Sequence, residues 1–120
     1  MVNNTQAIKE IELSIKRAVN LVDAGKALDR LRSNKDFKLI IGDGYLKEEA
    51  IRLVHLKSNV SMQTPDRQAS IMKQIDSIGQ LTQYFDTVLH QASLAQKAID
   101  TDEETRDELL AEDLNHGWNY

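Results

Sequence analysis

Residues 64–92, TPDRQASIMKQIDSIGQLTQYFDTVLHQA, carry the pattern that decides the fold. Mostly apolar side chains recur there in alternating steps of four and three, which is the spacing of one helix face with heptad character. The set comprises Ile71, Ile75, Ile78, Thr82, Phe85, Leu89 and Ala92. A second apolar stripe runs beside this seam, so the combined arc is wider than a two-stranded seam requires. The stretch therefore predicts a long amphipathic helix that packs on more than one neighbour.

Both ends of this helix carry recognisable signals. Thr64 supplies an N-cap hydroxyl and Pro65 occupies the first helical position, where a missing N–H has no cost. Towards the other end, Thr101 and Glu104 have the Thr-x-x-Glu form of a capping box. We therefore expect the helix to begin at Pro65 and to break near Asp100.

Helical periodicity also covers the first third of the chain. One apolar face begins near Thr5 and consists of Ile8, Ile11, Ile15, Val19 and Val22. Gly25 interrupts this face, either as a C-terminal cap or as a tolerated weak point. The apolar stripe continues to about Arg32, and residues 33–36 have the composition of a turn.

The stretch Gly42-Asp43-Gly44 resembles a ligand loop at first sight, but its surroundings favour a helix corner. It lacks the Gly-x-x-x-x-Gly-Lys-Ser/Thr pattern of a phosphate loop and the spaced oxygen ligands of an EF-hand. Glycines on either side of an aspartate can supply a sharp corner and an N-cap for a following helix. We expect a short helix to end at this corner and a third helix to begin at Tyr45.

Composition places these segments in one class of protein. The chain has 120 residues, of which 41% are hydrophobic and 28% charged, with one proline, five glycines and no cysteine. These values are typical of a soluble, all-α protein made and used in the cytoplasm. No apolar run approaches the ~18–20 residues of a membrane span, and the N-terminus lacks the apolar core of a signal peptide. We predict a helical hairpin or bundle of three to five helices, with one domain over residues 1–100 and an acidic helix end and tail over residues 101–120.

The charge is distributed unevenly. Residues 100–120 contain eight acids and one base, whereas the other 99 residues contain 14 bases and 11 acids. The acidic end is either a solvated helix end or an arm that docks on a basic partner or masks a basic patch. Trp118 and Tyr120 stand on this otherwise polar end, where they are either disordered or inserted into a partner.

Candidates for chemistry are weak. The three histidines, His55, His90 and His116, are too scattered for a metal site. Adjacent carboxylates on a helix diverge by about 100°, so they do not converge on one substrate atom. We therefore predict no catalytic residue, no metal and no cofactor. Basic residues between Lys26 and Lys38 leave nucleic-acid binding open as a less favoured function, because acids interleave with them.

Three stretches between Ala27 and Ile99, ALDRL (27–31), DFKLIIGDGYLKEEAIRLVHLK (36–57) and SMQTPDRQASIMKQIDSIGQLTQYF (61–85), resemble a group of small helical proteins of tailed bacteriophages. An alanine- and acid-rich helix follows them, as in that group. The resemblance implies a phage protein of the virion or head region, and it transfers no active site.

Together these observations predict a non-enzymatic structural or assembly protein that forms homo-oligomers and binds other phage proteins, in the host cytoplasm during expression or in the virion. The alternative is a host-takeover or anti-defence protein that binds a host factor or a nucleotide signal. The predicted protein interface comprises Ile71, Ile75, Ile78, Phe85, Leu89, Trp118 and Tyr120. The predicted corner and cap residues are Gly42, Asp43, Gly44, Thr64 and Pro65.

Overall fold

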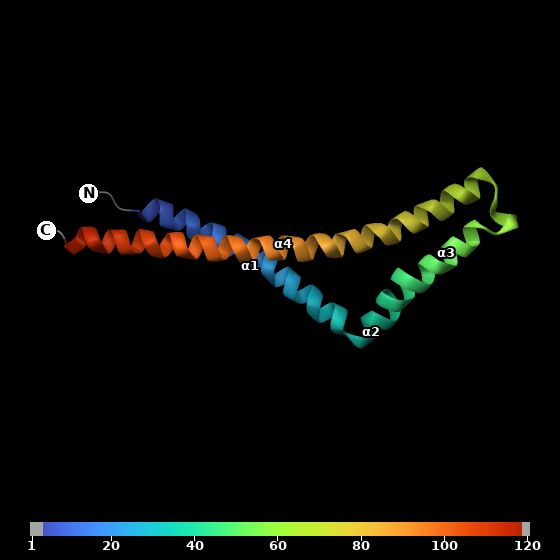
Figure 1. The fold of residues 1–120 in the computed structure, drawn as a ribbon, viewed down its shortest axis with the longest axis horizontal. Coiled ribbons are helices and arrows are strands. Elements are labelled where there is room, and N and C mark those ends of the chain that lie inside the picture. Colours follow the sequence, from blue (N-terminus) through green and yellow to red (C-terminus); the bar gives the residue numbers. More distant parts are fainter. Residues whose placement is uncertain (1–3, 119–120) are drawn as a thin grey trace. The chain divides into compact units, whose positions relative to one another are not determined.

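The fold is helical almost throughout. The computed structural model describes the backbone of residues 4–118 and the side chains of residues 4–115. About 95% of the structure is helical, and the described residues contain no strand. The predicted all-α fold with a long C-terminal helix is therefore confirmed. In chain order the elements are α1 (Thr5–Ser33), α2 (Lys35–Phe37), the π-helix η1 (Lys38–Glu49), α3 (Ala50–Lys57), the 3-10 helix η2 (Val60–Met62) and α4 (Pro65–Trp118) (Figure 1).

The chain divides into two compact units. Unit 1 comprises Met1–Lys26 and Val88–Tyr120, and unit 2 comprises Ala27–Thr87. Helices α1 and α4 each contribute to both units. The predicted division into residues 1–100 and 101–120 stays a prediction. Within unit 1 the acidic stretch belongs to α4 and lies beside the first part of α1 (Figure 1).

Unit 1 is an antiparallel helix pair with a small core. Ala18, Ala95 and Ile99 are buried, and Ile15 and Val22 pack against them. Polar contacts extend the pairing towards the chain ends. The Ser14 hydroxyl donates to Asp102 Oδ2 at 2.9 Å, and the side-chain amide of Asn4 donates to Asp113 Oδ1 at 3.2 Å. Two of the acids between 100 and 120 are thus hydrogen-bonded across the helix pair.

Helix α4 does not break near Asp100. The Thr101 carbonyl accepts a hydrogen bond from the hydroxyl of Thr105 at 3.0 Å, inside continuous helix. A capping box requires a non-helical residue at its first position. Ile99 and Asp102, on either side of Thr101, both face α1, and this packing keeps the segment helical. The predicted break at this position is therefore wrong.

Gly25 does not interrupt α1 either. The helix continues through it to Ser33, and Gly25 is buried. A methyl group added at Gly25 would overlap the Cβ of Ala92 on α4. The glycine therefore permits close approach of two helices in unit 1, which is a different role from a cap or a weak point.

Unit 2 is built around Leu53 of α3. Leu53, Ile71 and Ile78 are buried together, with partly buried apolar side chains of η1, α3, η2 and α4 around them. In Figure 1, α3 lies opposite the start of α4, and residues 58–64 connect them. The Thr64 hydroxyl accepts a hydrogen bond from the Arg67 N–H at 3.4 Å, and α4 begins at Pro65, the residue at which the sequence predicts it.

The Gly42-Asp43-Gly44 stretch is not a corner. It lies inside η1, whose helical backbone continues directly into α3, and no glycine among the described residues has a positive φ. Inward-facing side chains in this segment recur in steps of about four, for example at Ile41, Tyr45 and Glu49. A π-helical turn contains more residues than an α-helical turn, so side chains about four residues apart stay on the face that contacts one neighbouring helix. The turn lies earlier, at Asn34, whose side chain caps α2 by accepting from the Phe37 N–H at 3.0 Å.

Candidate functional site

Three predicted interface residues contact other side chains of the same chain, in the core of unit 2. Ile71 and Ile78 are buried against Leu53, and Ile75 packs on the same cluster. Ile71 and Ile78 are therefore covered within unit 2, whereas Ile75 is only partly buried. The interface prediction for these residues stays a prediction, while within the chain they contribute to the core of unit 2.

The other predicted interface residues are spread over both units. In unit 2, Phe85 is half-buried, and its ring centroid lies 6.0 Å from that of Phe37 at an interplanar angle of 57°. Leu89 is half-buried in unit 1. The side chain of Trp118 and the whole of Tyr120 lie outside the described residues, so the interface prediction for them stays a prediction.

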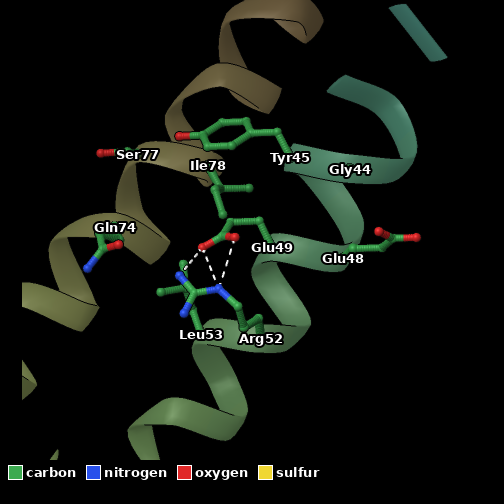
Figure 2. Close-up of a pocket in the computed structure, with 9 residues that line it drawn as sticks. All are labelled: Gly44, Tyr45, Glu48, Glu49, Arg52, Leu53, Gln74, Ser77 and Ile78. Carbon is green, nitrogen blue, oxygen red and sulfur yellow. Dashed lines mark hydrogen bonds and ion pairs between the residues drawn. The ribbon is translucent and has the colours of Figure 1, made fainter. Parts of the chain in front are cut away.

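A groove lies in unit 2 between η1, α3 and α4. Its volume is about 570 Å³, and its walls come from η1, α3 and α4 (Figure 2). It is lined by Gly44, Tyr45, Glu48, Glu49, Arg52, Leu53, Gln74, Ser77 and Ile78. Figure 2 shows the Tyr45 ring reaching towards Ser77 and Ile78, whereas the Glu48 carboxylate points away from α4. The groove thus combines an apolar floor with polar side chains at its edges.

Glu49 and Arg52 form the only charged pair drawn together in this groove (Figure 2). Arg52 Nε donates to both carboxylate oxygens of Glu49, at 3.0 and 3.1 Å, and Arg52 Nη2 donates as well. These hydrogen bonds lower the pKa of the Glu49 carboxyl and raise the pKa of the Arg52 guanidinium. The cation is therefore already neutralised, and a phosphate or carboxylate ligand would have to compete with Glu49 for it.

Unit 1 carries a second hollow of about 320 Å³ with a different character. Its lining is nearly all aliphatic or uncharged and comprises Arg17, Ala18, Leu21, Gln91, Leu94, Ala95 and Ala98. Leu21 is 42% exposed and Leu94 is 51% exposed, although both are large apolar side chains. This surface can take up an apolar side chain or helix face from another molecule.

Exposed apolar side chains are also frequent elsewhere among the described residues. Besides Leu94, the large apolar side chains that are more than half exposed are Leu39, Ile40, Ile51, Val54, Val60, Tyr84 and Leu114. Single exposed apolar residues are ordinary in soluble proteins. Here they outnumber the seven buried core residues, so the chain leaves much of its apolar surface uncovered.

The described residues contain neither a metal-binding cluster nor a helix that could cross a membrane. None of their His, Asp and Glu side chains gather into a group of three or more that could hold a metal ion. Within the same part of the chain, no helix combines the length and the hydropathy that crossing a bilayer requires. Comparisons with protein-family models, curated proteins and solved structures found no match to this chain.

Two features of unit 1 were not predicted from the sequence: the buried Gly25 at the contact between α1 and α4, and the exposed Leu21 and Leu94. Gly25 stands three residues after Val22, at the next inward position of the helix pair, where a small residue permits close contact. Leu21 directly precedes Val22, on the flank of the seam. A heptad analysis of α1 that included both seam flanks would have marked both positions.

Proposed function

We propose that this chain is a non-enzymatic structural or assembly protein of a tailed bacteriophage, and that it acts through helix-mediated protein–protein interaction and oligomerisation. The observation that carries this proposal is the number of exposed apolar side chains. Among the described residues, fourteen large hydrophobic side chains are exposed, whereas seven hydrophobic residues are buried.

A neighbouring subunit would cover such side chains. A standard interface buries about 800 Å² on each partner, and obligate oligomers bury more. Because burial of apolar side chains is favourable, contact with another protein through these residues would stabilise the complex. Subunits whose apolar side chains become buried only on assembly expose them in the isolated chain.

The grooves fit the same function. The unit 2 groove pairs its arginine internally, and the unit 1 hollow is lined almost entirely by uncharged side chains. Both linings suit side chains of a protein partner better than a small charged substrate. The phage assignment rests on the resemblance of residues 27–99 to small helical phage proteins.

Mass spectrometry of purified virions tests the proposed function. We expect this chain in the particles at a fixed ratio to the major virion proteins. Its absence from virions, together with capture of a host factor by the purified chain, would favour the alternative of a host-takeover or anti-defence protein.

A further inference from the structure

A smaller pocket of unit 2, here called the phenyl pocket, is lined by residues of α1, α2, η1 and α4. Its volume is about 240 Å³, and all of its lining residues belong to unit 2. Phe37 and Phe85 form part of its wall, with ring centroids 6.0 Å apart and an interplanar angle of 57°. Leu46 adds an aliphatic side chain. The pocket therefore offers an apolar surface that suits one ring or a short aliphatic chain.

Gly42 leaves space open at the wall of this pocket. It is half-buried within η1, yet a Cβ built on it meets no atom of a neighbouring side chain or helix within 4 Å. Two residues further on, a Cβ at Gly44 would lie 3.1 Å from the Leu39 carbonyl oxygen. The glycine at position 42 therefore borders unfilled space.

Two cations without a partner also line the phenyl pocket. Arg32 lies in the last turn of α1 and Lys38 begins η1, on either side of the turn at Asn34. Within the described part of the chain, neither side chain has a hydrogen bond or an ion pair. Asp86 on α4 is the one acid of the lining, so the pocket carries two positive charges and one negative charge. Its net charge of +1 favours an anionic ligand.

We propose that the phenyl pocket binds a small organic acid, with the carboxylate at Arg32 and Lys38 and the apolar body against Phe37 and Phe85. Arginine and lysine donate charge-assisted hydrogen bonds to a carboxylate, and phenyl rings take up an apolar body. The pocket is slightly smaller than the roughly 300–1,000 Å³ of sites for drug-sized ligands. The ligand should therefore have about the size of one ring with a short acid chain. This inference goes beyond the proposed function, because it concerns a small ligand rather than a protein partner.

An NMR titration of the isotope-labelled full chain with phenylacetate tests the inference. We expect saturable shifts of the backbone amide signals of Phe37, Lys38 and Phe85. The uncharged probe phenylacetamide has nearly the same shape, and it should bind about 10-fold more weakly, because hydrogen bonds to an ionised group are stronger than those to a neutral one.

Matched substitutions test the role of each charge. Arg32→Gln should raise the Kd of phenylacetate by about 10-fold, whereas Asp86→Asn should lower it by removing a repulsive charge. Arg30→Gln is the matched control, because Arg30 lies on the same helix but outside the pocket lining. It should leave the Kd within about twofold of the wild-type value. Gly42→Leu should fill the pocket and weaken both probes, and far-UV circular dichroism of all variants should report wild-type helix content.

Three kinds of result would overturn the inference. Shifts that do not saturate, or that spread over both units, would indicate unspecific association with exposed apolar side chains. Equal binding of phenylacetate and phenylacetamide, or equal effects of Arg32→Gln and Arg30→Gln, would contradict the role of the cations. Tighter binding of an acetylated dipeptide that ends in phenylalanine would show that a chain terminus is recognised instead of a small acid. Saturable binding of phenylacetate that Arg32→Gln selectively weakens would support the inference, whether or not the chain occurs in virions.

Discussion

Substitution of Gly25 by alanine should weaken unit 1, although alanine is the better helix former. In an exposed helix this change stabilises by about 1 kcal/mol. At position 25, however, the new methyl group would overlap the Cβ of Ala92, whereas carbon atoms in contact need about 3.5–4.0 Å. The two helices must move apart, and overpacking of this kind typically costs about 1–3 kcal/mol.

Gly79→Ala is the matched control for this substitution. Gly79 lies inside α4, and a methyl group built on it meets no atom within 4 Å. We therefore expect Gly79→Ala to stabilise by up to about 1 kcal/mol and Gly25→Ala to be less stable than this control by about 1–3 kcal/mol. Urea unfolding followed by far-UV circular dichroism, at one fixed protein concentration, measures both free energies.

A second substitution locates the cause of the Gly25 effect. If the overlap with Ala92 is responsible, Ala92→Gly should be destabilising alone but should restore space in the Gly25→Ala background. The double-mutant cycle should then give a favourable coupling of about 1 kcal/mol or more. Equal stabilisation by Gly25→Ala and Gly79→Ala, or a coupling near zero, would refute the close contact between α1 and α4 at this point.

Three further predictions concern unit 2. Gly44→Ala should destabilise relative to Gly42→Ala by about 0.5–2 kcal/mol in urea unfolding, because a Cβ at Gly44 would lie 3.1 Å from the Leu39 carbonyl oxygen and one at Gly42 meets nothing within 4 Å. Leu53→Ala should cost about 2–5 kcal/mol, since Leu53 is 1% exposed at the centre of the unit 2 core. The Glu49 carboxyl should titrate below its ordinary pKa by NMR, because Arg52 donates hydrogen bonds to its ionised form.

Each of these predictions has a control or a contradicting result. Equal stabilities of the Gly42 and Gly44 variants would argue against the π-helical turn. Val54→Ala, at an exposed position next to Leu53, should change stability by less than about 0.5 kcal/mol, and a loss as large as that of Leu53→Ala would contradict the assigned core. The small stabilisation from ionised Glu49 should be present at neutral pH and lost as the pH falls through its folded pKa. Arg52→Gln should return that pKa to its ordinary value.

The fold class and the start of the longest helix were predictable from the sequence, because they depend on local information. Steps of three and four in residues 71–92 require a helix, whatever it packs against. Thr64 and Pro65 define its start through their own backbone and hydroxyl chemistry. Neither inference needs knowledge of a distant residue.

The roles of the glycines and of the apolar seam depend on distant residues, so they could not be predicted in this way. Gly25 has the same local sequence signal whether it ends a helix or lets Ala92 approach, and only the pairing of α1 with α4 distinguishes the two. The seam at Ile71 and Ile78 likewise indicates a partner helix without showing which one. The structure shows that α3 of the same chain is that partner, through Leu53.

The acidic end of the chain illustrates the same limit. Charge alone favoured a solvated end or a docking arm, but Asp102 and Asp113 accept hydrogen bonds from Ser14 and from the backbone and side chain of Asn4. Such contacts join residues about a hundred positions apart. No local pattern in residues 100–113 reports them.

The molar mass of the purified full-length chain in solution is the most direct test of a protein that completes its core through partners. Light scattering coupled to size exclusion, over a range of concentrations, should give at least twice the 13.6 kDa chain mass. A wild type that stays at the mass of one chain at the highest concentrations would contradict the proposed oligomerisation.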